Sequence, residues 1–469
     1  MQKIPKLRWA LSASMIATLA ACANYSGIDP VAKPIDATPL GLDNKAAPLP
    51  DTDWWLALND AQLNALIQQA VANSPNLRAS QARLALAQAQ TAQRKAADGP
   101  QVGLEGSLQR QLFSANTIYP PPYGGTEYDM GTLQAGASWE LDFFGKNSAA
   151  LAAALGQSRA AEADLKAARG LLAVKVARSY YQVARIEAQS RLVQRTLAVR
   201  EALKGLVGDR LKAGLDTQLE LEQSQGALPD VQLQLEQLSE QKELTLNALA
   251  ALTAQPRAAL QLQLSSVPDL TQIALPAQPQ ALPLNLLGAR SDIAAARWRI
   301  EAAQKDVQAA KASFYPNIDL TAYLGFSSIG FDKLLTSKSS QWGVGPAINL
   351  PLFDSGRLRA QLGSKTADLD AAVESYNTQV LEAVHEVSDQ LATAQSVQRQ
   401  QAQQRVATQS AEHGLQIAQS RLKAGLATQL VALQAELPVL VQQRNATELA
   451  ARALDNRVQL LHAVGAALP

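Results

Sequence analysis

The chain has 469 residues, a formal net charge of +1 and only 18% charged residues. This length allows two or three ordinary domains, and the nearly balanced charge excludes a strong electrostatic field for nucleic acid. Aromatic residues make up only 5% of the sequence, whereas alanine, glutamine and leucine are abundant. This composition favours long helices with small contact residues.

The first 21 residues are predicted to form a targeting signal. Basic residues precede an apolar stretch, residues 9–21, that is too short to be a membrane-spanning helix. The stretch ends in a Leu-Ala-Ala-Cys sequence that resembles a bacterial lipobox, and Cys22 is the single cysteine of the chain. We therefore expect lipidation of Cys22, with a stray thiol behind an ordinary signal peptide as the alternative. By the same resemblance, Ala23 implies retention in the outer membrane.

The remaining sequence contains one unit twice. The ten-residue segment that begins at Arg210 returns at Arg421 with nine identical positions, and Gly145 and Gly356 keep the same offset of 211 residues. A repeat this long indicates a duplicated domain. The expected order is a signal over residues 1–21, a lipidated tether over 22–59, repeat 1 over 60–270, a linker over 271–288 and repeat 2 over 289–469.

Each repeat begins with a helix and continues with two stretches of alternating apolar residues. The strands are expected at about residues 101–111, 132–142, 317–327 and 342–352. Strands of 9–11 residues are long enough to cross a membrane when tilted. A closed barrel needs about eight strands, so the four would have to be pooled across subunits, and three chains would supply twelve. Two surface hairpins on a soluble periplasmic domain are the alternative.

Each repeat ends in a long helical hairpin. The long helices are expected at about 147–207 and 358–422, and the return helices at about 217–253 and 428–463. Sixty helical residues extend about 90 Å, so these helices must pack side by side as a coiled coil or tube. The Arg-Leu-Lys-Ala-Gly motif between them has a basic last turn and a terminating glycine, as expected of a hairpin tip. We expect a kink or break at Pro229 and Pro438.

Several motifs carry a resemblance to a known family. They are Trp54-Trp55 with Leu63, Leu66 and Ile67, the turn at 74–77, the strand-to-helix junctions at 141–146 and 350–357, the two tips, and residues 460–465. Together they resemble the TolC-like outer-membrane factors, specifically the lipidated efflux branch. The resemblance implies a mainly α fold with a small membrane β-barrel contribution, in which a homotrimer forms a twelve-stranded barrel and a twelve-helix periplasmic tube.

The resemblance also implies a function. The trimer would be a passive outer-membrane channel for drugs or toxic compounds, supplied by a periplasmic adaptor and an inner-membrane pump of the resistance-nodulation-division type. The chain would be lipid-anchored in the outer membrane and extend into the periplasm. A conduit for secreted proteins, or a lipid-anchored coiled-coil spacer that forms no channel, are the alternatives.

The resemblance places the working residues at the two tips. The implied periplasmic aperture comprises Leu219, Leu430, Lys212, Lys423, Asp216 and Glu220, and the implied adaptor contacts are Arg210, Ala213, Gly214, Arg421, Ala424 and Gly425. Asp216 and Glu220 have two open interpretations, since acids at a helix N-terminus often only cap it. Two departures from the family weaken an acidic ring in repeat 2, because Ala427 replaces an acid and Gln434 stands where relatives carry an aspartate.

Catalytic chemistry is not expected. The three histidines lack metal-ligand spacing, and no phosphate-binding loop, nucleophile elbow or zinc motif is present. We therefore expect no enzyme activity, no cofactor, no metal and no nucleic-acid partner.

Overall fold

The computed structural model describes residues 25–35, 53–116, 118–264, 267–273, 290–351, 353–354 and 356–464. The expected targeting signal, Cys22 and most of the expected linker lie outside these residues. The chain divides into two compact units. Unit 1 comprises Met1–Ile35, Ala82–Glu162 and Ala295–Asn377, and unit 2 comprises Asp36–Gln81, Ala163–Ala294 and Thr378–Pro469. Each unit therefore draws segments from both sequence repeats.

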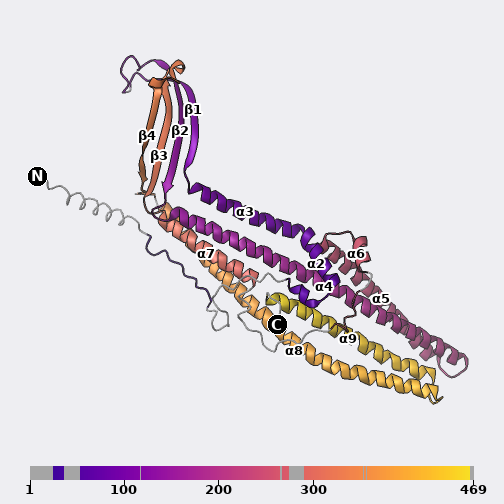
Figure 1. Cartoon of the computed structure of the whole chain (residues 1–469). Helices are drawn as coiled ribbons and strands as arrows, with labels where there is room; N and C mark the ends of the chain where they lie inside the picture. The colour runs from indigo at the N-terminus through magenta and orange to yellow at the C-terminus, as the bar shows by residue number, and fades with distance from the viewer. Residues whose placement is uncertain are drawn as a thin grey trace. The chain divides into compact units, whose positions relative to one another are not determined.

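Unit 1 contains one antiparallel sheet whose order is β1-β2-β3-β4 (Figure 1). Its strands are β1 (Gln101–Leu112), β2 (Glu127–Leu141), β3 (Asn317–Ile329) and β4 (Ser340–Asn349). β2 begins five residues before its expected start, and β4 begins and ends earlier than expected. The 3-10 turns η3 (Phe331–Lys333) and η4 (Ser337–Ser339) connect β3 to β4.

The sheet has one apolar and one polar face. Leu104, Ala135, Leu324 and Trp342 form a continuous row across the four strands. The next row, which points to the other face, consists of glutamate, glycine and glutamine residues. Leu104 and Trp342 are about three-quarters exposed, at 75% and 74%. A sheet with a wide uncovered apolar face requires an apolar environment outside the single chain.

The helices occupy the remaining described residues. They are η1 (Trp54–Leu58), α2 (Ala61–Asn73), α3 (Pro75–Ala97), α4 (Lys146–Lys212), α5 (Gln218–Thr253), α6 (Arg257–Gln263), α7 (Ser291–Ala312), α8 (Arg357–Lys423) and α9 (Gln429–Ala463). α4 and α8 each have 67 residues, or about 100 Å at 1.5 Å per residue. No described helix meets the combined length and hydropathy required of a membrane span.

Small residues let the helices approach closely in unit 1. A Cβ placed on Gly156 of α4 would lie 2.9 Å from the Cβ of Ala302 on α7, closer than two carbon atoms can pack.

The N-terminal segment 25–35 lies on α8, where the Asp370 carboxylate accepts hydrogen bonds from the amides of Val31 and Ala32, both at 2.9 Å. The amide of Ile35 donates to Asn377 at 2.7 Å.

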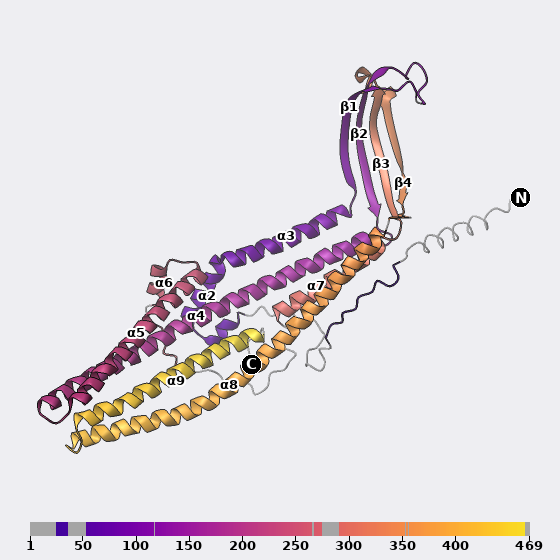
Figure 2. The ribbon, with the colours of Figure 1, turned by 180° about the vertical axis from the view of Figure 1, so that it is seen from behind.

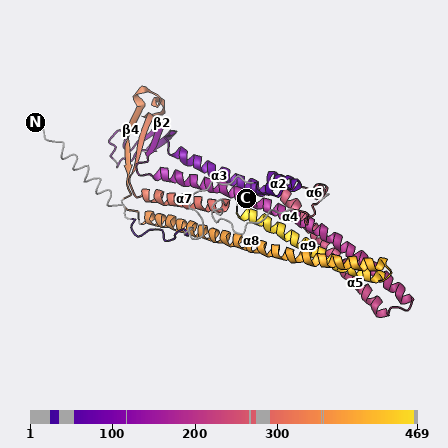
Figure 3. The same ribbon diagram turned by 60° about the horizontal axis from the view of Figure 1, so that its bottom comes forward.

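In unit 2 the hairpins α4–α5 and α8–α9 run alongside each other in every view (Figures 1, 2 and 3). Of the kink or break expected at the two prolines, the break is wrong, because α5 continues through Pro229 and α9 through Pro438. Each proline costs its helix a backbone hydrogen bond. The residues that follow are buried, Val231 in α5 and Val439 in α9, so packing on the neighbouring helices holds each helix together.

Candidate functional site

The two hairpin tips have the same backbone geometry. At the first tip the amide of Leu215 donates to the carbonyl of Arg210 at 2.8 Å, and the amide of Gly214 donates to Leu211 at 2.9 Å. This pair of bonds defines a Schellman termination, which needs a left-handed residue at its centre. Gly214 supplies it with a φ of 72°. The second tip repeats the pattern around Gly425, which has a φ of 70°.

The side chains of the first tip form an ion pair across the turn. The Arg210 guanidinium binds the Asp216 carboxylate through two hydrogen bonds, from Nε at 2.9 Å and from Nη2 at 2.8 Å. These hydrogen bonds lower the pKa of Asp216 below its ordinary value. Asp216 therefore joins the end of α4 to the approach to α5, and its role in the aperture stays a prediction.

Glu220 caps the helix that returns from the first tip. The Glu220 amide donates to Thr217 Oγ1 at 3.5 Å, and the Glu220 carboxylate accepts from the Thr217 amide and hydroxyl. This reciprocal arrangement is a capping box, and it satisfies two donors at the start of α5. The hydrogen bonds from Thr217 lower the pKa of Glu220. The geometry thus supports the capping interpretation of Glu220, while a role in the aperture stays a prediction.

The second tip has the same turn without these contacts. Ala427 replaces Asp216, and the N-cap residue Thr428 makes no side-chain capping bond. Within the described residues, Arg421 and Lys423 form no ion pair. By contrast, Lys212 of the first tip contacts Asp209 at 3.1 Å. The two tips therefore share a backbone and differ in electrostatics.

The two predicted aperture leucines lie in different surroundings. Leu219 is 66% exposed. Leu430, at the equivalent position 211 residues later, is partly buried and packs against a cluster of Val199, Leu203 and Leu440. The second return helix α9 is therefore attached at its start to α4 of the first hairpin. Ala213 and Ala424, the predicted adaptor contacts, are both exposed.

A series of ion pairs continues the contact between α4 and α9. Arg178 binds Asp455 at 2.5 Å, Arg185 binds Glu448 at 2.7 Å, and Arg195 binds Glu436 at 2.6 Å. The arginines all lie on α4 and the carboxylates on α9, so α4 contacts both its own return helix and that of the other repeat. The sequence offers one signal for this series, the similar spacing of arginines in one helix and acids in the other.

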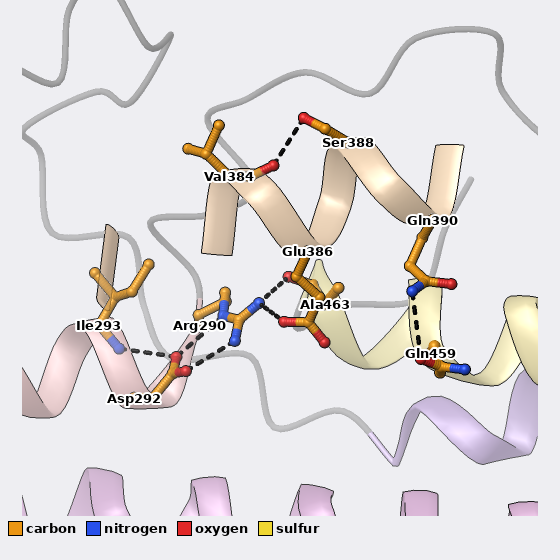
Figure 4. A network of polar contacts seen from close by, with 9 residues as sticks. All are labelled: Arg290, Asp292, Ile293, Val384, Glu386, Ser388, Gln390, Gln459 and Ala463. Atoms are coloured by element: carbon orange, nitrogen blue, oxygen red, sulfur yellow. Dashed lines mark hydrogen bonds and ion pairs between the residues drawn. The ribbon is translucent and has the colours of Figure 1, made fainter. Parts of the chain in front are cut away.

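A second polar cluster lies where α7 begins, and Figure 4 shows it. The Arg290 side chain, only 10% exposed, binds Asp292 at 2.8 Å and Glu386 at 2.7 Å, and donates to the Ala463 carbonyl at 3.1 Å. Burial and the nearby guanidinium lower the pKa of His462, one of the lining residues of an adjoining 290 Å³ cavity. No group of three or more metal-ligating residues occurs among the residues the structure describes. The cluster thus joins α7, α8 and α9.

Comparison with known proteins identifies the class. The model of the family described as outer membrane efflux protein matches residues 66–255 and 282–466, and the chain belongs to this family. The multidrug resistance outer membrane protein MdtQ of Escherichia coli O157:H7 is 31% identical over 444 residues, which cover 93% of this chain and 91% of MdtQ. The fusaric acid resistance protein FusA of Burkholderia cepacia is 36% identical over 367 residues, covering 76% of this chain and 68% of FusA.

A solved structure agrees with the family. The crystal structure of the outer membrane protein VceC from Vibrio cholerae matches with a TM-score of 0.79 and 37% identity, covering 89% of this chain and 99% of VceC. The expected fold, mainly helical with long hairpins and a small membrane sheet, is confirmed. The protein is an outer-membrane efflux channel.

Proposed function

We propose that three copies of this chain form a channel that passively conducts drugs or other toxic small molecules out of the cell. The observation that carries the proposal is the uncovered apolar face of the four-stranded sheet. Neither β1 nor β4 has a second partner within the described sheet, and an open edge in lipid leaves backbone groups unpaired. Pooling three sheets into a twelve-stranded barrel would pair every edge.

The cargo and the partners follow from the relatives. MdtQ is described by multidrug resistance and FusA by fusaric acid resistance, which supports drugs and other toxic small molecules as cargo. The channel would receive them from a resistance-nodulation-division pump through a periplasmic adaptor. The exposed turns at Ala213 and Ala424 would contact that adaptor. The channel would carry out no catalytic step of its own.

Lipid attachment at Cys22 would anchor the chain in the outer membrane. Tyr25, three residues later, packs edge-on against Phe314 with ring centroids 5.7 Å apart, and Lys311 lies 5.6 Å from the Tyr25 ring. Phe314 closely precedes β3. Three residues extend at most about 11 Å, so a lipid on Cys22 would lie near the base of the sheet.

Deletion and reconstitution test the proposal together. A strain without the gene should become more sensitive to several toxic compounds, and the wild-type gene should restore resistance. The purified protein should be trimeric by native mass spectrometry and should form ion-conducting pores in planar bilayers. A monomeric protein that inserts no pores would refute the channel and favour the coiled-coil spacer.

Two variants test the finer parts of the proposal. Cys22→Ser should retain the pore but lose the mass of the attached lipid, and an unchanged mass would disprove lipidation. A photocrosslinker at position 213 or 424 should capture the co-expressed adaptor. A crosslinker at the exposed position 102 of the sheet is the control, and equal capture from all three sites would count against docking at the tips.

A further inference from the structure

The four long helices of unit 2 have a defined order. α5 packs on α4 through Ile186, Val193, Val231 and Leu238. α4 binds α9 through the three ion pairs, and α9 binds α8 through hydrogen bonds such as Gln404 Nε2 to Gln442 Oε1 at 2.8 Å. α4 and α9 therefore lie between α5 and α8, with one direct hydrogen bond from Arg444 of α9 to Gln234 of α5 at 3.2 Å, and Figure 2 shows α8 at one side of the group. α5 and α8 are the two edge helices.

The face of α5 that points away from α4 carries a row of exposed residues, which we call the α5 stripe. It consists of Glu222, Leu233, Glu236 and Glu240, at spacings of 11, 3 and 4 residues. These spacings place all four on one side of a helix, opposite the residues that pack on α4. All four are exposed, and Leu233 is 58% exposed. Within the described residues none of the three acids has an ion-pair partner.

The outer face of α8 carries a matching row, which we call the α8 stripe. It consists of Arg399, Val406, His413, Ile417 and Arg421, at spacings of 7, 7, 4 and 4 residues. These spacings place all five on one side of the helix. All five residues are exposed, with Val406 at 59%, and the two arginines form no ion pair in the part of the chain that is described.

The charges of the two edge helices are opposite. α5 contains six acidic residues and one lysine. The lower part of α8, residues 391–423, contains four arginines and lysines and one glutamate. Each stripe combines an exposed aliphatic residue with charges of one sign, as the flanks of a coiled-coil interface do. Complementary charges across an interface steer assembly and exclude the wrong pairing.

We propose that the α5 stripe of one copy packs against the α8 stripe of a second copy and forms the subunit seam of the helical tube. Like-charged pairing of α5 with α5 or of α8 with α8 is disfavoured, so each subunit adds the next in the same direction. A head-to-tail contact of this kind closes into a ring. This proposal rests on the proposed trimer, and it identifies the surfaces through which the three subunits associate.

Charge reversal tests the seam. One variant carries Glu222→Lys, Glu236→Lys and Glu240→Lys, a second carries Arg399→Glu and Arg421→Glu, and a third combines all five changes. Glu412→Lys, on α8 but outside the stripe, is the control. Each variant is expressed in full length, its helix content is checked by circular dichroism, and its mass is measured by native mass spectrometry in detergent. Resistance of the complemented deletion strain is measured in parallel.

The expected result is loss of the trimer in both one-sided variants and its return in the combined variant, with the control unchanged. Trimers that survive both one-sided reversals would overturn the seam, and if resistance is nevertheless lost, the stripes bind another protein. One-sided loss that the combined variant does not restore would overturn the pairing of these two surfaces. A wild-type protein that is not a trimer would instead contradict the proposed function.

Discussion

Truncation of the two leucines predicted to line the aperture distinguishes the effect of burial from the effect of position in the repeat. Leu430→Ala removes a partly buried side chain from its contacts with Val199, Leu203 and Leu440. Leu219→Ala makes the same change at the equivalent site of the first repeat, where the side chain is 66% exposed. A fully buried leucine loses about 2–5 kcal/mol on truncation, so a partly buried one should lose about 1–2 kcal/mol. The exposed site should change by less than about 0.5 kcal/mol.

Hydrogen exchange of the full-length protein in detergent measures the difference. Because about 1.4 kcal/mol corresponds to a tenfold change in an equilibrium, Leu430→Ala should speed local opening at the start of α9 by roughly five- to thirtyfold. The start of α5 should exchange at its wild-type rate in Leu219→Ala. Equal acceleration in both variants, or none in Leu430→Ala, would refute the claim that α9 is held by this cluster.

Leu430 and Lys423 are also predicted to limit conductance through the pore. Leu430→Ala combined with Lys423→Ala should raise single-channel conductance in planar bilayers, because an apolar ring at a constriction can exclude water. Lys212→Ala with Leu219→Ala is the matched variant of the first tip. If the conductance of the first pair is unchanged, Leu430 and Lys423 do not contribute to the gate.

Three further changes follow from contacts described above. Asp216→Ala removes the partner of Arg210, so trypsin should cleave faster after Arg210. Ala427→Asp should give Arg421 such a partner and slow cleavage after it. Unchanged cleavage rates would show that the backbone turn alone protects these peptide bonds. Arg290→Met leaves two carboxylates unpaired, and since these are 41% and 34% exposed, the loss should be about 2–4 kcal/mol, seen as a lower unfolding temperature. Arg290→Lys keeps the positive charge and should lose less stability than Arg290→Met. An equal loss would show that the charge does not stabilise this cluster. Gly156→Val should cost about 1–3 kcal/mol by overpacking. Gly205→Ala on the same helix, where nothing lies within 4 Å, should stabilise it by about 0.5–1 kcal/mol.

The regular features of the fold could be predicted from local patterns. Alternation of apolar residues located the four strands, and the repeated Arg-Leu-Lys-Ala-Gly motif located both turns. These signals are reliable because the period of the side chains and the need for a glycine at φ near 70° are properties of a few neighbouring residues. The expected helix break at the two prolines was wrong for the opposite reason, since packing from other helices decided whether the helix continued.

Contacts between the repeats could not be predicted in the same way. The pairing of Arg195 with Glu436 joins residues 241 positions apart, and no local pattern determines which acid faces which arginine. The unequal burial of Leu219 and Leu430 was hidden for a related reason, because equivalent positions in two repeats need not have equivalent neighbours. The residue roles at the tips therefore stay predictions for experiment.

The position of α4 between α5 and α9 also limits how the duplicated gene can diverge. The first repeat supplies the helix on which the second repeat's return helix packs, so neither half retains its partner surface if the chain is divided at the linker. A chain cut there should give two fragments that fold together only when co-expressed. Substitutions on the side of α4 that contacts α9 are then constrained by the other repeat. The two repeats can diverge at their tips, whereas the packed parts of their long helices must change together.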